Sequence, residues 1–249
     1  GVPAVMDVNF TLERGKVLTI VGESGSGKTT VIRALMGLLP VGGEVTEGSM
    51  LFNGQDLLTL SKSEWRAIRG KDMAMIFQDS GSALDPIVRI GKQFRELFKS
   101  HIEITNDECD RRAIELLESV SLPNGADILR RYPHELSGGQ RQRVGIAMAL
   151  AMDPALLIGD EPTSALDVTT QSQVVMQMLE LAKEHHSAIV MVTHNLGVAA
   201  YMSDYIIVMK KGRVVDTGTP QDILENPSNE YTKQLKDAVP TLGGGRYID

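Results

Sequence analysis

A glycine-rich stretch, "GESGSGKTT" at residues 22–30, has the residue types needed to hold a phosphate group. It follows the pattern Gly-x-x-x-x-Gly-Lys-Thr, in which glycines let consecutive backbone N–H groups turn toward one anion. Lys28 adds a positive charge for β- and γ-phosphates, and the Thr29 hydroxyl suits Mg²⁺. We predict a phosphate site made by Gly22, Glu23, Ser24, Gly25, Ser26, Gly27, Lys28, Thr29 and Thr30.

Two acidic residues end a short apolar segment, "LLIGDEP" at residues 156–162. Ligands of open α/β sheets bind beyond the carboxyl ends of the strands. We therefore expect Asp160 to hold Mg²⁺ through water and Glu161 to polarise an attacking water. An acid pair that only caps a strand end is the alternative, and the phosphate loop in the same chain favours the catalytic interpretation.

Gln78 and His194 also follow apolar segments, "MAMIF" and "AIVMVT". If both segments are strands of the same sheet, His194 can reach a γ-phosphate. The Gln78 amide can ligate Mg²⁺ and hydrogen-bond water. A lone histidine at a strand end is more often structural, and its expected place at the carboxyl edge of the sheet favours a catalytic role.

A second glycine pair lies in "LSGGQ" at residues 136–140, without a neighbouring lysine of the phosphate-loop kind. A helical pattern, "GQRQRVGIAMALA", starts there. Ser137 and the amides of Gly138 and Gly139 would then form an anion site at a helix N-terminus.

Alternating strands and helices must position these residues. We expect strands at residues 4–12, 16–22, 73–79, 155–162 and 188–195, and a hairpin at 205–218 that turns at Lys211-Gly212. Helical spacing covers residues 28–39, 90–100, 106–120, 138–152 and 169–186, with Asn106 or Asp107 as the cap of the third. This order predicts an α/β fold with a mostly parallel sheet and an inserted helical subdomain.

Bulk composition excludes several classes of protein. The 249 residues are 42% hydrophobic, enough for a packed core, and the net charge of −7 disfavours generic nucleic-acid binding. The single cysteine, Cys109, excludes an intrachain disulfide and is expected to be a surface or half-buried thiol. Apolar runs fall short of the roughly 20 residues that span a bilayer, so we expect a soluble cytoplasmic protein.

The motifs stand in one order: "GESGSGKTT", Gln78, "LSGGQ", "LLIGDEP", "SALD" at residues 164–167, and His194. Over almost the whole chain this order closely resembles the nucleotide-binding subunit of ABC transporters. The resemblance implies ATP and Mg²⁺ as ligands, with Thr29, Gln78 and Asp160 at the metal. It also implies Glu161 as catalytic base, His194 as switch histidine, and Asp167 of the D-loop near ATP. Two subunits would meet head to tail, with the signature Ser137, Gly138, Gly139 and Gln140 of one over the ATP of the other.

The resemblance also implies a division into domains. Residues 1–84 and 154–226 would form a P-loop NTPase (RecA-like) core with an N-terminal antiparallel β subdomain. Residues 85–153 would form the helical subdomain that carries the signature motif, and residues 227–249 a C-terminal tail.

Two segments, at residues 77–94 and 226–242, resemble the peptide and nickel importer ATPases. The expected function is ATP hydrolysis that drives a membrane permease for uptake of peptides, nickel or a related small solute. The expected partners are a second ATP-binding subunit (a related chain or a second copy), two permease subunits and, indirectly, an extracytoplasmic binding protein. The subunit would sit peripherally on the cytoplasmic face of the membrane, and we expect no nucleic acid.

Two departures and three alternatives accompany this resemblance. The chain has Asn229-Glu230-Tyr231 where the subgroup usually has His-Pro-Tyr. No aromatic precedes Phe10, where the family stacks adenine, so we expect that upstream residues are missing.

A non-transport ABC ATPase of the DNA-repair or translation class is the main alternative, and it would need a long coiled-coil insertion or tandem cassettes. The second alternative is a generic P-loop kinase or GTPase, in which "LSGGQ" would have no role. The third is an export ATPase, and exporters often have the cassette fused to membrane helices, which this sequence does not show.

Overall fold

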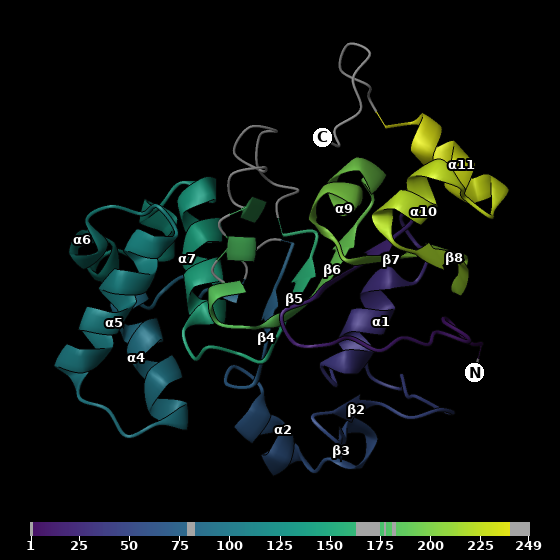
Figure 1. Ribbon diagram of the computed structural model, residues 1–249. Coiled ribbons are helices and arrows are strands. Elements are labelled where there is room, and N and C mark those ends of the chain that lie inside the picture. The colour runs from purple at the N-terminus through teal and green to yellow at the C-terminus, as the bar shows by residue number, and fades with distance from the viewer. Residues whose placement is uncertain (1, 79–82, 163–174, 177, 181–182, 240–249) are drawn as a thin grey trace. The chain divides into compact units, whose positions relative to one another are not determined.

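The computed structural model describes residues 2–78, 83–162, 175–176, 178–180 and 183–239 (Figure 1). The chain divides into two compact units, one made of Gly1–Thr59 with Ile189–Asp249 and the other of Leu60–Ala188. Each unit is described by itself.

In the first unit, β6, β1, β7 and β8 lie side by side in that order in one sheet. β1 is parallel to β6 and β7, and β8 is antiparallel to β7. Every residue of β1 after Val17 is buried, as expected for a strand of a parallel sheet covered on both faces. The bounds are β1 (Val17–Val21), β6 (Ala188–Thr193), β7 (Tyr205–Lys210) and β8 (Arg213–Gly218).

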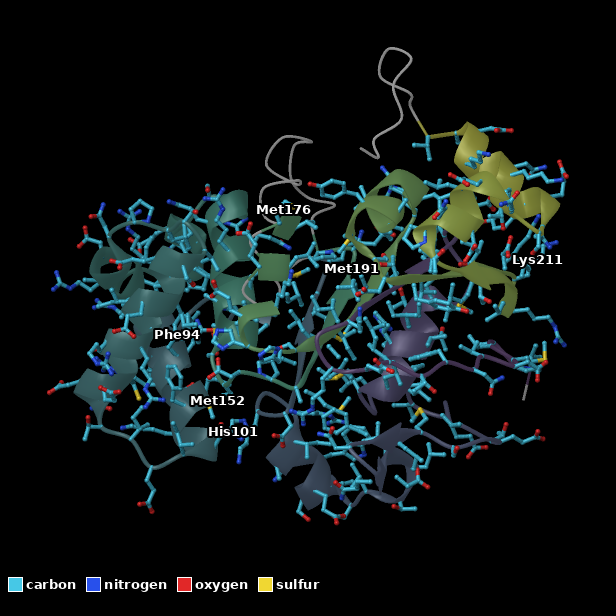
Figure 2. All side chains as sticks on the ribbon, viewed as in Figure 1. Phe94, His101, Met152, Met176, Met191 and Lys211 are labelled. Atoms are coloured by element: carbon cyan, nitrogen blue, oxygen red, sulfur yellow. The ribbon has the colours of Figure 1, made fainter. Side chains whose placement is uncertain are left out.

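The predicted hairpin at residues 205–218 is confirmed. Lys211 and Gly212 form its turn with φ of 48° and 77°, and this pair of left-handed residues matches the twist of the two strands. The side chain of Lys211 points to solvent at the tip (Figure 2).

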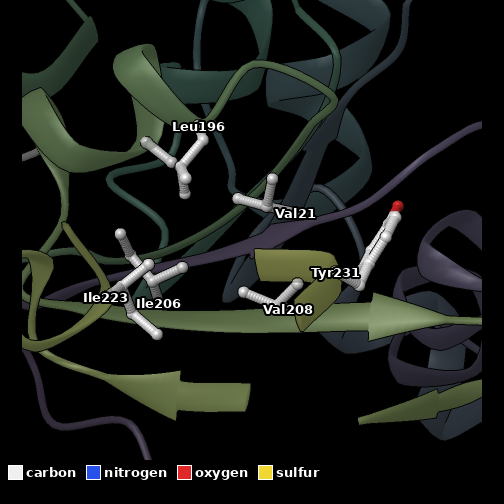
Figure 3. Packing of buried hydrophobic residues seen from close by; sticks show 7 residues of the cluster. Val21, Leu196, Ile206, Val208, Ile223 and Tyr231 are labelled. Atoms are coloured by element: carbon white, nitrogen blue, oxygen red, sulfur yellow. The ribbon is translucent and has the colours of Figure 1, made fainter. Parts of the chain in front are cut away.

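Within residues 2–59 and 189–239, this unit has four α-helices, and three of them begin with a side-chain cap. Asn195 caps α9, Thr219 caps α10 and Asn229 caps α11, each through its side-chain oxygen. In Figure 3, α9, α10 and α11 contribute Leu196, Ile223 and Tyr231 to one apolar cluster with β1 and β7. The bounds are α1 (Lys28–Leu35), α9 (Leu196–Met202), α10 (Pro220–Glu225) and α11 (Glu230–Asp237).

The strand predicted at residues 4–12 is wrong. Within residues 2–12, only Met6 makes a bridge, to Arg213, and its N–H donates to Gly212 O at 2.8 Å. Asp7 has φ of 57°, which breaks the extended conformation that the apolar alternation suggested. The short antiparallel pair β2 (Leu51–Phe52) and β3 (Gln55–Asp56) follows later, and the 3-10 turn η1 (Leu57–Thr59) ends this part.

The second unit combines a parallel strand pair with a group of packed helices. β4 (Met73–Ile76) pairs with β5 (Leu156–Asp160) in a register that places Ile76 opposite Gly159. The helices include α2 (Lys62–Ile68), α4 (Ile90–His101), α5 (Asn106–Ser119), α6 (Gly125–Arg130) and α7 (Gly138–Leu150), with the 3-10 turn η2 (Pro133–Glu135) before α7.

Two local predictions in this unit are corrected. Thr105 caps α5 by accepting the N–H of Glu108, in place of the predicted Asn106 or Asp107. Cys109 is fully buried, because it lies on the apolar face of α5 that also carries Ala113 and Leu117. Phe94 of α4 is equally buried in the same unit (Figure 2).

None of the helices seen in the described residues combines the length and the apolar character required to cross a membrane.

Candidate functional site

The phosphate loop joins the end of β1 to the start of α1. Gly25 and Gly27 have φ of 78° and 102°, a left-handed conformation that favours glycine. Gly27 is the N-cap of α1, and the N–H of Ser26 donates to Glu23 O at 3.2 Å. The loop therefore folds back on itself directly before a helix N-terminus, the arrangement that binds phosphate.

Lys28 is buried inside this loop, with 5% of its surface exposed. Its Nζ donates to Gly22 O at 2.6 Å and to Glu23 O at 2.8 Å. A buried ammonium group needs such acceptors, because leaving it without them would cost several kcal/mol, about the desolvation penalty of an unpaired ion. The loop thus holds its own cation in place.

Neighbouring segments leave no space for a side chain at Gly22 or at Gly27. A Cβ on Gly22 would lie 2.2 Å from the backbone oxygen of Met209, and a Cβ on Gly27 would lie 2.8 Å from Val5 Cγ2. The N–H of Gly212, in the hairpin turn, donates to Ser26 O at 2.9 Å. The shape of the loop is therefore fixed by the segments before and after it in the fold.

His194 leaves the sheet beside this loop. Val21, the last residue of β1, is paired with Thr193, the last residue of β6. The phosphate loop and His194 therefore begin at the same edge of two adjacent parallel strands, as the sequence suggested. His194 is exposed, and Asn195 after it caps α9.

Asp160, Glu161 and Gln78 belong to the second unit, at the ends of β5 and β4. Asp160 is the last residue of β5 and is 9% exposed. Glu161 is half-buried with φ of 45°, so the chain turns sharply at this position. Gln78 lies two residues beyond β4 and is exposed. Because β4 and β5 run parallel, these three residues share one sheet edge.

The signature motif forms the first turn of α7. Ser137 is the N-cap: its Oγ accepts the N–H of Gln140 at 3.2 Å, and the Gln140 side chain accepts the N–H of Ser137 at 2.9 Å. Gly138 is exposed, and a Cβ added there would meet nothing nearer than Arg141 Nη2 at 3.9 Å. Gly138 and Gly139 both have helical backbones. The motif therefore presents an accessible helix N-terminus.

The predicted site residues are divided between the two units. The phosphate loop and His194 lie in the first, whereas Gln78, Asp160, Glu161 and the signature motif lie in the second. Asp167 and the rest of "SALD" lie outside the described residues. In the described ranges, no group of three or more His, Cys, Asp or Glu could by itself hold a metal ion.

The side-chain contact of Tyr231 with the phosphate loop was not predicted from the sequence. The Tyr231 hydroxyl on α11 accepts the N–H of Glu23 at 2.9 Å, across 208 residues of sequence. The resemblance of the tail to importer ATPases includes Tyr231, but no spacing rule connects that position to the loop.

Known proteins match the chain over nearly its full length. The profile of the family described as "ABC transporter" matches residues 5–164. The dipeptide transport ATP-binding protein DppD of Lactococcus lactis is 47% identical over 97% of this chain and 69% of its own length. The oligopeptide transport ATP-binding protein OppD of Bacillus subtilis is 46% identical over 97% of this chain and 68% of its own length.

Two solved structures have the same fold. One is described as a dimeric post-hydrolysis state of the ATP-binding cassette MJ0796 bound to ADP and Pi. It matches with a TM-score of 0.77 and 30% identity over 87% of this chain and 90% of that one. The other is cbiO1 from Clostridium perfringens, with a TM-score of 0.75 and 28% identity over 90% and 84% of the two chains. With its α/β P-loop fold and these matches, the chain belongs to the ABC transporter family, as one of its ATP-binding and ATP-hydrolysing subunits.

Proposed function

We propose that this ATPase subunit powers the uptake of peptides through a membrane permease. The single observation that carries the proposal is the identity of 46–47% with proteins named for dipeptide and oligopeptide transport. A glutathione import ATP-binding protein, 44% identical over the whole chain, is also named for a peptide-like solute. These names favour transport over the DNA-repair or translation alternative. Nickel and related small solutes rest on sequence resemblance alone.

ATP is proposed to bind at Gly22–Thr30. The loop amides and the N-terminus of α1 would hold the phosphates, and Lys28 would keep its hydrogen bond to Gly22 O while it directs another N–H toward the β- and γ-phosphates. Lys28 starts next to its proposed target, because its Nζ already lies inside the loop. Little reorganisation is then needed when ATP enters.

Mg²⁺ is proposed to be held by Thr29, Gln78 and Asp160. A hydroxyl, an amide oxygen and a carboxylate are hard oxygen donors, so the donor set suits this ion. Its contribution would be to neutralise phosphate charge. Glu161 is proposed to orient and deprotonate the attacking water, with His194 and Gln78 contacting the γ-phosphate and the water.

The signature motif is proposed to act on the ATP of a second subunit. Its accessible helix N-terminus can receive a γ-phosphate, and the Ser137 hydroxyl can still donate a hydrogen bond while its oxygen accepts one in the cap. Asp167 would lie at the same interface. A related solved cassette is dimeric, which supports this arrangement. The second subunit would be a related chain, as in the heterodimeric peptide importers that the sequence resembles, or a second copy.

Residues 85–153 are proposed as the helical subdomain, residues 1–84 and 154–226 as the ATP-binding core, and residues 227–249 as the tail. The mutual contacts of α4, α5, α6 and α7 support the first assignment. We place the subunit peripherally on the cytoplasmic face of the membrane, on two permease subunits that an extracytoplasmic binding protein supplies with solute.

The variant Glu161→Gln tests this proposal. Removing the base should lower ATP hydrolysis at least a hundredfold while ATP still closes the dimer, so size-exclusion chromatography with MgATP should show a stable dimer. Glu118→Gln, an exposed acid on α5, is the matched control and should behave as wild type. Rapid turnover by the Glu161→Gln protein would exclude the assigned role.

The transport proposal needs its own measurement. The chain should co-purify with the permease subunits of a peptide importer, and peptide uptake in membrane vesicles should require ATP and Glu161. Co-purification with a DNA-repair or ribosomal complex instead would contradict the proposal.

A further inference from the structure

The Tyr231 hydroxyl on α11 binds the first peptide unit of the phosphate loop. It accepts the N–H of Glu23 at 2.9 Å. That N–H belongs to the planar peptide Gly22–Glu23, and the carbonyl of the same peptide, Gly22 O, accepts Lys28 Nζ at 2.6 Å. One rigid plane therefore connects the tyrosine on one side with the lysine on the other.

A planar peptide transmits orientation. If its N–H is fixed toward Tyr231, its C=O is fixed in the opposite direction, toward Lys28. Hydrogen bonding at the N–H also polarises the peptide and strengthens its carbonyl as an acceptor. The position of Lys28 thus depends on a side chain near the other end of the sequence.

Tyr231 is itself held firmly in the first unit (Figure 3). It is 3% exposed and packs in the cluster that contains Val21, the last residue of β1, and Val208 of β7. Lys210 Nζ lies 4.4 Å from the centre of the tyrosine ring, a cation–π contact. Burial raises the pKa of the Tyr231 phenol, so the hydroxyl stays neutral at physiological pH.

The start of α11 is fixed by a carboxylate of β8. Asp216 accepts hydrogen bonds from the N–H and the hydroxyl of Ser228, at 2.9 and 2.7 Å, and from the N–H of Asn229 at 3.2 Å. Burial opposes the charge on Asp216, but these hydrogen bonds prevail and lower its pKa below the usual value. The charged form therefore holds the helix that presents Tyr231.

The geometry points to Tyr231 as a positioning residue for ATP binding: through the Gly22–Glu23 peptide, its hydroxyl orients Lys28 for the phosphates. This inference rests on the proposed role of Gly22–Thr30 as the ATP site. Tyr231 contacts no reacting atom and acts only through the loop. In the opposite direction, ATP that engages Lys28 should tighten the attachment of α11, because coupling between two sites is reciprocal.

Tyr231→Phe tests the hydroxyl alone, because phenylalanine keeps the buried ring and its contact with Lys210. We expect the Kd for ATP to rise about 3- to 10-fold, the effect of losing one hydrogen bond that organises the site. Tyr201→Phe removes a hydroxyl from an exposed tyrosine on α9 of the same unit and is the matched control. It should leave the Kd unchanged.

A purely structural tyrosine would give a different result. In that case Tyr231→Phe would lower the Tm of the nucleotide-free protein and leave the Kd for ATP within about 1.5-fold of wild type, which would overturn the inference.

Lys28→Met separates the proposed ATP site from the proposed role of Tyr231. If this variant binds ATP as wild type does, the proposed ATP site fails. If it loses binding while Tyr231→Phe retains full affinity, only the role of Tyr231 fails.

Hydrogen exchange on the unmodified protein gives an independent measurement. Adding ATP should slow amide exchange in residues 227–237 more than in α5, which serves as the reference helix. Unchanged exchange in residues 227–237 at saturating ATP would overturn the coupling, whatever the variants do.

Discussion

The two glycine-rich motifs of this chain differ in what makes glycine necessary. In the phosphate loop, Gly25 and Gly27 have left-handed backbones, and a Cβ on Gly22 would overlap the backbone of β7. In the signature motif, Gly138 has a helical backbone, and an added Cβ would make only an ordinary van der Waals contact with Arg141 Nη2. The phosphate loop therefore requires glycine to adopt its conformation. In the signature motif, neither the backbone conformation nor the space around position 138 requires glycine.

This difference indicates whether each motif functions within its own subunit or against another one. A loop whose glycines are required by its own surroundings is completed within the subunit. The N-terminus of α7 has no side chain at Gly138, although an alanine would fit there. This leaves the backbone N–H groups open to close approach by a ligand from outside the unit. The proposed occupant is the γ-phosphate bound by a second subunit. Three substitutions test the comparison.

Gly22→Ala should have the largest effect on folding. The new methyl would lie 2.2 Å from Met209 O, a backbone atom that cannot move without disturbing β7. We expect the free energy of unfolding to fall by about 3 kcal/mol and ATP binding to be lost, as measured by urea unfolding and nucleotide titration. An alanine variant as stable as wild type would show that the loop is not confined by β7.

Ser137→Ala should have an intermediate effect. It removes the oxygen that accepts the N–H of Gln140, which should lower stability by about 1 kcal/mol, the usual value of an N-cap. ATP binding by the isolated subunit should be unchanged, and hydrolysis by the assembled dimer should fall at least tenfold. Ser119→Ala, at the exposed end of α5, is a control that should leave hydrolysis intact. Normal turnover by Ser137→Ala would remove Ser137 from the proposed interface.

Gly138→Ala should hardly change the stability of the subunit. The methyl group meets nothing nearer than Arg141 Nη2 at 3.9 Å, so the shift in the free energy of unfolding should lie within about 0.5 kcal/mol. ATP binding by the monomer should also be unchanged, while ATP-driven dimerisation and hydrolysis should be lost. If the variant instead unfolds, or if it hydrolyses ATP normally, the contrast with Gly22 disappears.

Much of the site could be predicted from sequence because its signals are local. The pattern of Gly22–Thr30 fixes a loop between a strand and a helix, and apolar runs ending in Asp160 and at His194 indicate buried strands with polar ends. These features depend on a few neighbouring residues. In the structure, β5 ends at Asp160 and β6 ends directly before His194, as these patterns suggested.

The remainder depends on contacts between distant residues. The apolar alternation at residues 4–12 predicts a strand, but the hairpin turn at Gly212 takes the hydrogen bond of Met6, and Asp7 turns the chain. The contact of Tyr231 with Glu23 spans 208 residues, so no periodicity could reveal it. Cys109 looked exposed because its sequence neighbours are polar, although its own face of α5 is apolar.

The hydrogen bonds of the phosphate loop to Gly212 and Tyr231 also have a consequence for folding during synthesis on the ribosome. Residues 22–30 are translated long before Gly212 and Tyr231, which hydrogen-bond to Ser26 and Glu23. A nascent chain can form β1 and α1 sooner, yet it holds the Gly22–Glu23 peptide in its final orientation only after α11 has left the exit tunnel. The loop therefore reaches the orientation described above only once α11 has been translated, when the residues of β1, β6, β7 and β8 are already present.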